Sequence, residues 1–177
     1  VGRLNRDKGV SELVEAFNRL PESAHLILVG GLDASAPVSN ETLARIESNP
    51  RIHALGFLSD IRPALKLADF LVLPSYREGF PNVVLQAGAM GLPVIATDIS
   101  GCNEAVEPRL NGWLVPPRSV EPLENAMKEA MQSSEDTRAK MGENARTRIK
   151  QRFERQQHWQ RMQKFYQELL NERVASI

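Results

Sequence analysis

Short apolar runs alternate with stretches of helical periodicity through residues 1–115 of the chain. The expected strands are residues 1–4, 26–29, 51–55, 70–73, 93–97 and 112–115. Most of these runs lack a polar alternate face, which is typical of strands that are covered by helices on both sides. Repeated strand–helix units of this length predict an α/β fold, a Rossmann-like, doubly wound parallel sheet of about six strands.

Helical segments separate these runs and take over completely toward the end of the chain. Helices are expected at residues 10–20, 40–46, 61–68, 82–90, near 122, at 135–152 and at 155–174. A length of 177 residues suits one domain with an extension. We therefore expect residues 1–150 to form the Rossmann-like domain and residues 151–177 a C-terminal helix. One face of that helix is apolar and needs a partner surface; its residues are Trp159, Met162, Tyr166, Leu169 and Leu170.

Composition excludes several classes of protein. Lys plus Arg and Asp plus Glu tie at 22 each, which argues against a dedicated nucleic-acid binder. Cys102 is the single cysteine, and His25, His53 and His158 are scattered, so no metal site is predicted. No apolar run reaches the roughly 18 residues of a membrane span and no signal peptide opens the chain, so we expect a cytoplasmic protein. The chain begins with Val1 and is expected to be a piece of a longer one.

The junction between the first strand and the first helix has the composition of a phosphate-binding loop. Gly2 permits close approach of a ligand to the backbone, and Arg3 and Lys8 add cationic groups beside a helix N-terminus. These features together could hold a diphosphate. A turn with solvated basic residues is the alternative, and the junction alone does not decide between them.

Two further loops follow strands at the same predicted edge of the sheet. Glu78 stands just before a helix start, where a carboxylate can accept hydrogen bonds from sugar hydroxyls, and Gly79 leaves backbone N–H groups free to face a ligand. Gln86 lies eight residues further on, and the loop after the fifth strand contains Gly101 and Glu104. Because ligands bind where parallel strands end, three such loops predict one shared pocket.

These motifs together resemble the carboxy-terminal half of retaining GT-B glycosyltransferases. The family is the large group 1 of glycosyl transferases, which includes bacterial capsule, O-antigen and lipid-linked-oligosaccharide enzymes. The resemblance covers nearly the whole chain. Its anchors are Gly2-Arg3-Leu4 with Lys8-Gly9, Ala68-Asp69 through Pro74-Ser75, Glu78-Gly79-Phe80-Pro81, Gly91 through Thr97, Gly101 with Glu104, and Asn111 through Val115.

The resemblance implies that this half binds a nucleotide-sugar donor, with UDP as the first expectation and GDP as the second. Arg3 and Lys8 would neutralise the diphosphate, so that neither a metal nor another cofactor is expected. Glu78 would hold hydroxyls of the transferred hexose or amino-sugar. The resemblance adds a set of further donor-binding residues: Gly2, Gly79, Phe80, Pro81, Asn82, Gln86, Gly101 and Glu104.

One position departs from the family pattern. The family usually carries a second glutamate eight residues after the first, which accepts both ribose hydroxyls, whereas this chain has Gln86. A carboxamide offers one oxygen acceptor and an NH₂ group instead of two carboxylate oxygens. Losing a charged hydrogen bond would lower donor affinity on the order of tenfold. Tolerated drift is the other interpretation, and both stay open.

By the same resemblance, the acceptor would be a surface glycan or a lipid-linked sugar held by a missing N-terminal domain, onto which the last helix packs. The chain alone would then be inactive. A sugar-nucleotide epimerase of the same architecture and a non-catalytic nucleotide-binding module are the alternatives. Residues 138–164 contain nine basic and two acidic residues. This basic stretch is either a solvated helical face or a contact with anionic lipid at the inner face of the membrane.

Overall fold

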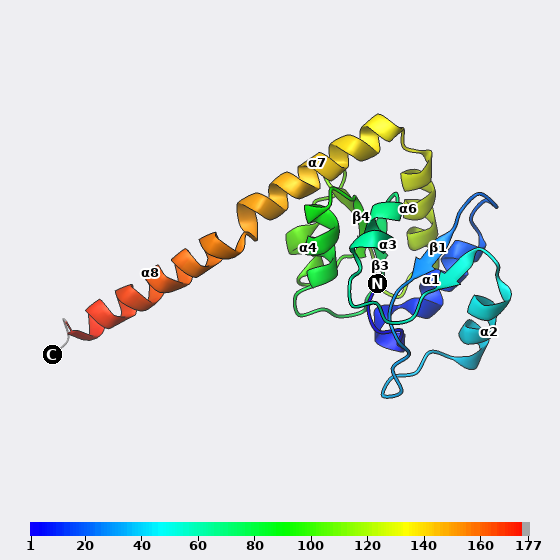
Figure 1. Cartoon of the computed structure of the whole chain (residues 1–177), viewed down its shortest axis with the longest axis horizontal. Coiled ribbons are helices and arrows are strands. Elements are labelled where there is room, and N and C mark those ends of the chain that lie inside the picture. The colour runs from blue at the N-terminus through cyan, green and yellow to red at the C-terminus, as the bar shows by residue number, and fades with distance from the viewer. Residues whose placement is uncertain (175–177) are drawn as a thin grey trace.

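The computed structural model describes residues 1–174, an α/β body from which one long helix projects (Figure 1). The elements follow the predicted alternation of strand and helix. In chain order they are η1 (Arg6–Lys8), α1 (Val10–Asn18), β1 (Leu26–Leu28), α2 (Asn40–Ser48), β2 (Ile52–Ala54), α3 (Arg62–Leu67), β3 (Leu71–Leu73), α4 (Asn82–Ala89), β4 (Val94–Thr97), α5 (Cys102–Ala105), β5 (Gly112–Val115), α6 (Val120–Gln132), α7 (Glu135–Arg152) and α8 (Arg155–Val174).

The strands are all parallel, but they form two sheets instead of the single sheet expected. One sheet has the order β1-β2 and the other the order β3-β4-β5, which makes five strands in the described part of the chain. An apolar cavity of about 300 Å³ separates the two sheets and is lined by residues 26–29 on one side and 68–72 on the other. The prediction of about six strands in one sheet was therefore wrong in detail, although the parallel α/β class is confirmed.

The sixth expected strand, residues 1–4, does not form a regular strand. Its backbone runs beside the end of β1, where the Gly2 N–H donates to the Val29 carbonyl and the Leu4 N–H donates to the Gly31 carbonyl, both at 2.8 Å. The segment pairs only with residues beyond the end of β1, so a single bridge between Leu4 and Leu32 forms instead of a ladder.

Helices cover both faces of the larger sheet, as the continuous apolar runs indicated. Every residue of β4 is buried. Ile95 packs on one side with residues of α1 and α6, whereas its neighbours Val94 and Ala96 pack on the other with residues of α4 and α5. Each apolar position of the strand therefore stabilises the body, at roughly 25 cal/mol per Å² of apolar surface buried.

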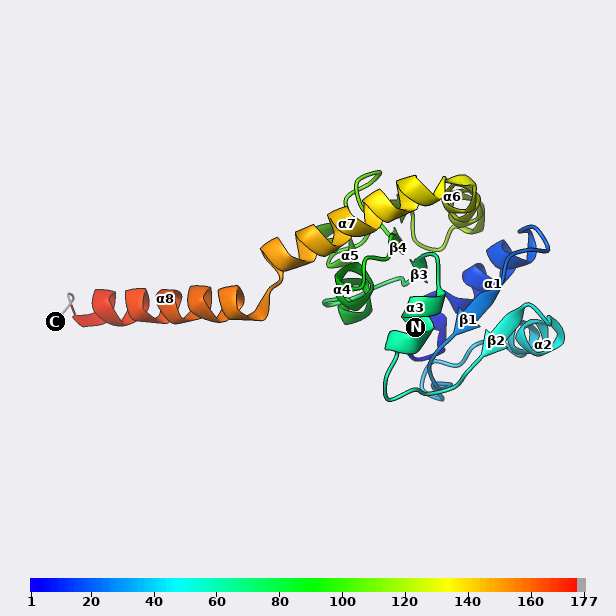
Figure 2. The ribbon, with the colours of Figure 1, turned by 45° about the horizontal axis from the view of Figure 1, so that its top comes forward.

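Side chains that cap the helices fix where several of them begin. The Ser39 hydroxyl accepts a hydrogen bond from the Thr42 N–H at 3.2 Å and so caps α2. The Ser134 hydroxyl caps α7 in the same way. Figure 2 shows α7 lying across the body and α8 continuing beyond it. The α8 side chains that the structure describes are exposed. Among the described residues, no helix is both long and apolar enough to cross a bilayer.

Candidate functional site

A cleft of about 590 Å³ opens where the loops after β2 and β3 face the start of the chain. Its size lies within the range of small-molecule sites, and its position is the one at which parallel α/β sheets bind ligands. The cleft combines polar loop residues with a few apolar ones. Its lining residues are Val1, Gly2, Lys8, Ser59, Asp60, Ile61, Arg62, Glu78, Phe80, Pro81, Asn82, Val83, Gln86, Ala89 and Met90.

Lys8 and Glu78, which are 70 residues apart in the sequence, form the charged centre of the cleft. The Lys8 Nζ lies 2.5 Å from the Glu78 Oε1. Lys8 ends the short helix η1, whose first turn is capped by the Asn5 side chain. Gly9 follows with φ of 65°, and a Cβ there would lie 2.1 Å from the Pro74 carbonyl oxygen. This close approach brings the end of η1 against the loop that carries Glu78.

Hydrogen bonds within and beside the loop after β3 hold Glu78 in place. The Ser75 hydroxyl donates to the Glu78 Oε1 at 2.7 Å, and Ser75 itself is fully buried. The Thr97 hydroxyl at the end of β4 donates to the Ser75 carbonyl at 2.5 Å. The Tyr76 N–H donates to the Asp7 carbonyl at 2.8 Å, which ties the same loop to η1. The carboxylate is thus presented from a fixed backbone.

The start of α4 forms one wall of the cleft. Phe80, Pro81, Asn82 and Val83 line the cleft at this end of the helix, and no side chain caps it. Free N–H groups at a helix N-terminus favour a negative charge. Gln86 is exposed one turn further along and lines the same wall. The wall therefore combines an anion-favouring helix end with a carboxamide.

The opposite wall comes from residues that the sequence analysis did not select. Ser59, Asp60 and Arg62 lie between β2 and α3 and line the cleft. The Asp60 carboxylate accepts hydrogen bonds from the Arg62 backbone N–H and from its guanidinium, at 2.8 to 3.0 Å, and these bonds lower the pKa of Asp60. The sequence did contain a signal for this wall: Ser59 and Asp60 stand between a strand and the start of a helix. Because all parallel strands end at one edge of the sheet, such a loop is expected to lie near the ligand.

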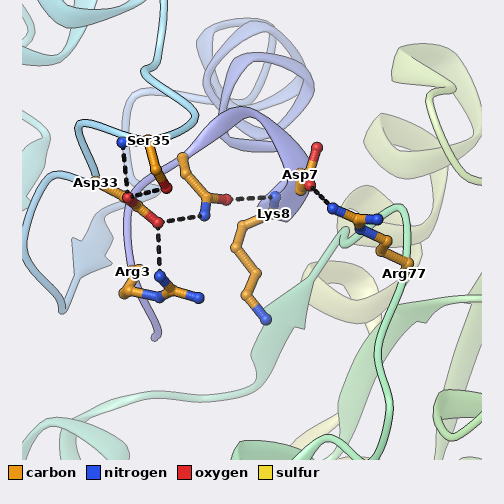
Figure 3. A network of polar contacts seen from close by, with 7 residues as sticks. Arg3, Asp7, Lys8, Asp33, Ser35 and Arg77 are labelled. Carbon is orange, nitrogen blue, oxygen red and sulfur yellow. Dashed lines mark hydrogen bonds and ion pairs between the residues drawn. The ribbon is translucent and has the colours of Figure 1, made fainter.

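Arg3 is not brought to the cleft. Its guanidinium lies 2.8 Å from an Asp33 carboxylate oxygen, and its side chain is 72% exposed (Figure 3). Asp33 also accepts hydrogen bonds from Ser35 and Asn5. The Ser35 and Asn5 side chains, followed by the Ser35 N–H and the Arg3 charge, lower the pKa of Asp33 to about 2. In Figure 3, Lys8 joins this network through its backbone N–H, which donates to the Asn5 side chain at 3.0 Å. The role predicted for Arg3 at a phosphate thus stays a prediction.

Of the remaining predicted site residues, Gly79, Gly101 and Glu104 do not line the cleft. Gly101 has φ of 83°, and a Cβ there would lie 2.9 Å from the Gly79 carbonyl oxygen. Its lack of a side chain lets the loop after β4 support the loop that carries Glu78. Glu104 is exposed, and its backbone carbonyl accepts a hydrogen bond from Arg148 on α7. Gly79 and Glu104 are exposed and Gly101 is buried, and all three lie outside the cleft lining.

The remaining reactive side chains lie outside the cleft lining. Cys102 is fully buried, and burial followed by the negative charge of Glu78 raises the pKa of its thiol to about 12, which makes it inert. His25 and His53 are not scattered as expected: His25 lies just before β1 and His53 lies in the adjacent strand β2, and their ring nitrogens are 3.1 Å apart. Among residues whose side chains the structure describes, no group of three or more His, Cys, Asp or Glu could hold a metal ion.

A parallel α/β body with a polar cleft at the carboxyl ends of its strands defines the class of ligand-binding, doubly wound α/β domains. Within that class, the chain belongs to the family described as "Glycosyl transferases group 1", whose profile matches residues 1–148. The family resemblance inferred from the motifs is therefore confirmed.

Two relatives match 97% and 59% of the chain. It is 27% identical over 175 residues to the capsular polysaccharide biosynthesis glycosyltransferase CapM of Staphylococcus aureus, which covers 97% of this chain and 46% of CapM. It is 40% identical over 107 residues to the N,N'-diacetylbacillosaminyl-diphospho-undecaprenol alpha-1,3-N-acetylgalactosaminyltransferase of Campylobacter jejuni, which covers 59% of this chain and 27% of that enzyme. The chain thus spans less than half the length of either relative.

Solved structures give the same fold. The structure of Anabaena HepE in complex with UDP matches with a TM-score of 0.86 and 27% identity, over 94% of this chain and 48% of HepE. HepE has also been solved with UDP-glucose, and that structure matches with a TM-score of 0.81. These similarities confirm the expected half of a GT-B fold.

Proposed function

We propose that the chain is the donor-binding half of a retaining glycosyltransferase and that it holds a UDP-sugar in the cleft. The observation that carries the proposal is the meeting of Lys8, Glu78 and the uncapped start of α4 in one cavity of about 590 Å³. The complexes of HepE with UDP and UDP-glucose support UDP as the nucleotide. The named relatives are glycosyltransferases, which favours transfer over the epimerase alternative.

The chemistry follows from the charges. When the bond between the sugar and the phosphate breaks, its electron pair goes to the phosphate oxygen, and negative charge accumulates on the diphosphate. The Lys8 ammonium and the N–H groups at the start of α4 would stabilise that charge, the task that a metal ion performs elsewhere. Glu78 would orient the sugar by accepting hydrogen bonds from its hydroxyls. The departing phosphate can then help to deprotonate the acceptor on the same face.

The acceptor is proposed to be a polysaccharide or a lipid-linked sugar, as the names of CapM and the Campylobacter enzyme suggest. A further domain would supply its site, with the exposed apolar face of α8 packed against it. The basic stretch is only partly available to anionic lipid, because Arg138, Arg146 and Arg148 donate to backbone carbonyls. Vesicle sedimentation with neutral and anionic lipid tests the contribution of the remaining basic residues.

Titration calorimetry with UDP and GDP, together with thermal shifts, tests the proposed function. UDP at 100 times its dissociation constant should stabilise the chain by about 2.7 kcal/mol. Lys8→Met should weaken UDP binding by about 10- to 100-fold, because a hydrogen bond to a charged group contributes about 1.5–3 kcal/mol. Lys140→Met, which removes an exposed lysine of α7, is the matched control. Binding of neither nucleotide, or equal binding by both variants, would contradict the proposal.

A further inference from the structure

We propose that Ser75 is a positioning residue for Glu78: its hydroxyl fixes one carboxylate oxygen so that the other faces the sugar of a bound donor. The inference rests on the proposed function, because it gives Ser75 a task only when a sugar lies against Glu78. Ser75 does not line the cleft itself.

The hydrogen bonds at Glu78 are asymmetric. Lys8 donates to Oε1 at 2.5 Å and Ser75 donates to the same Oε1 at 2.7 Å. The Glu78 side chain is 11% exposed and lines the cleft. With two protein donors on Oε1, Oε2 is the oxygen left to accept hydrogen bonds from a ligand.

The two donors differ in how firmly they are held. Ser75 is fully buried at the end of β3, and its carbonyl accepts a hydrogen bond from Thr97, a residue of β4 that is 1% exposed. Lys8 reaches Glu78 through a flexible four-carbon side chain that is 27% exposed. The serine is therefore anchored to the sheet, whereas the lysine can change partners.

Binding of a nucleotide sugar would affect Ser75 and Lys8 differently. A diphosphate at the start of α4 attracts the Lys8 ammonium, which then shares or leaves its bond to Glu78. Ser75 keeps its hydrogen bond, since its hydroxyl is buried away from the cleft. Loss of the Ser75 hydroxyl should consequently impair recognition of the sugar while leaving recognition of the nucleotide intact. A merely structural role for Ser75 would impair both.

The test compares UDP with UDP-glucose by titration calorimetry on the chain. For Ser75→Ala, we expect an unchanged dissociation constant for UDP and one for UDP-glucose that is about five- to tenfold weaker, the loss of one hydrogen bond. Ser48→Ala, which removes an exposed hydroxyl from α2, should change neither. In a Glu78→Gln background, the additional Ser75→Ala substitution should have little effect on UDP-glucose binding, because the two residues act as a unit.

Thr97→Val is a second variant that tests the same role of Ser75 if Ser75→Ala fails to fold. Thr97→Val removes the hydroxyl that holds the Ser75 carbonyl and keeps the side-chain shape, so it should weaken UDP-glucose binding selectively and by less. If the unchanged chain binds neither UDP nor UDP-glucose, the proposed function fails, and the role of Ser75 fails with it. If it binds both while Ser75→Ala and Thr97→Val weaken the two ligands equally, or weaken neither, only the role of Ser75 is wrong.

Discussion

At the scale of single residues, the cleft is organised around one carboxylate. Glu78 accepts hydrogen bonds from Lys8 and Ser75 on the same oxygen, so its position is set before any sugar arrives. Such preorganisation reduces the conformational freedom that binding has to remove. In the proposed complex, a diphosphate would contact Lys8 and a sugar would contact Glu78, so that two separate contacts would replace the ion pair between these residues.

Gln86 provides a direct test of how the ribose is held. Replacing Gln86 with glutamate puts two carboxylate oxygens on the wall of α4 in place of one amide oxygen and an NH₂ group, so we expect the affinity for UDP to rise about tenfold. Titration calorimetry on the two chains measures the change. Equal affinities would show that the amide already serves the ribose, or that the ribose does not reach this wall.

Asp33 links the first loop to stability at low pH. Its pKa of about 2 lies below the model-peptide value of 3.8, so the folded state favours the charged form. The stabilisation is therefore fully present above about pH 4, near the unfolded value, and is lost as the pH falls toward 2. Asp33→Asn should be less stable than the unchanged chain at pH 6, and the difference should shrink between pH 4 and pH 2. Urea unfolding across this range checks it, and a pH-independent difference would contradict it.

Sequence motifs identified several residues of the cleft but not the contacts between them. Lys8, Glu78 and Gln86 stand at characteristic distances from strand ends, and the structure brings them to one cleft. The ion pair between Lys8 and Glu78 was not predictable, because it depends on how two loops 70 residues apart are brought together. The ion pair between Arg3 and Asp33 was not predictable for the same reason, because only the tertiary fold brings Asp33 next to Arg3.

At the scale of elements, apolar periodicity identified nearly every strand and helix but not how the strands pair. The runs at 26–29 and 70–73 both became strands, yet a cavity lies between them instead of a ladder. An apolar run buried on both faces carries no signal of its neighbours in the sheet, since any parallel strand would satisfy it. The division into two sheets therefore could not be read from the sequence.

Helix α7 packs closely against the end of α4 at Gly142. For a Gly142→Ala substitution, this packing and intrinsic helix propensity predict opposite changes in the free energy of unfolding. A Cβ on Gly142 would lie 1.9 Å from the Gly91 carbonyl oxygen. Propensity alone would make Gly142→Ala stabilising by up to about 1 kcal/mol, whereas this close approach should make it destabilising by about 1–3 kcal/mol.

Denaturant unfolding measures that sign. Gly31→Ala is the matched control, because a Cβ on Gly31 would meet nothing within 4 Å, and it should change the free energy of unfolding by less than about 0.5 kcal/mol. A Gly142→Ala chain as stable as the unchanged one would show that α7 shifts freely against α4.

At the scale of the whole molecule, the body and α8 have different surfaces. The body buries its apolar residues in two clusters on either side of the larger sheet. Helix α8 projects from the body (Figure 1). Its Trp159, Phe165 and Tyr166 side chains are each more than half exposed. An exposed aromatic face of this kind is typical of an interaction surface. In the proposed function, this face packs against the domain that would hold the acceptor.

Hydrogen exchange with and without UDP-glucose tests the central claim, that the cleft between residues 59–62 and α4 binds a nucleotide sugar. With saturating ligand, backbone amides in peptides covering 59–62 and 78–86 should exchange more slowly, while those of α2 and α8 should not change. Slower exchange confined to other segments, or no change anywhere at millimolar UDP-glucose, would contradict the claim.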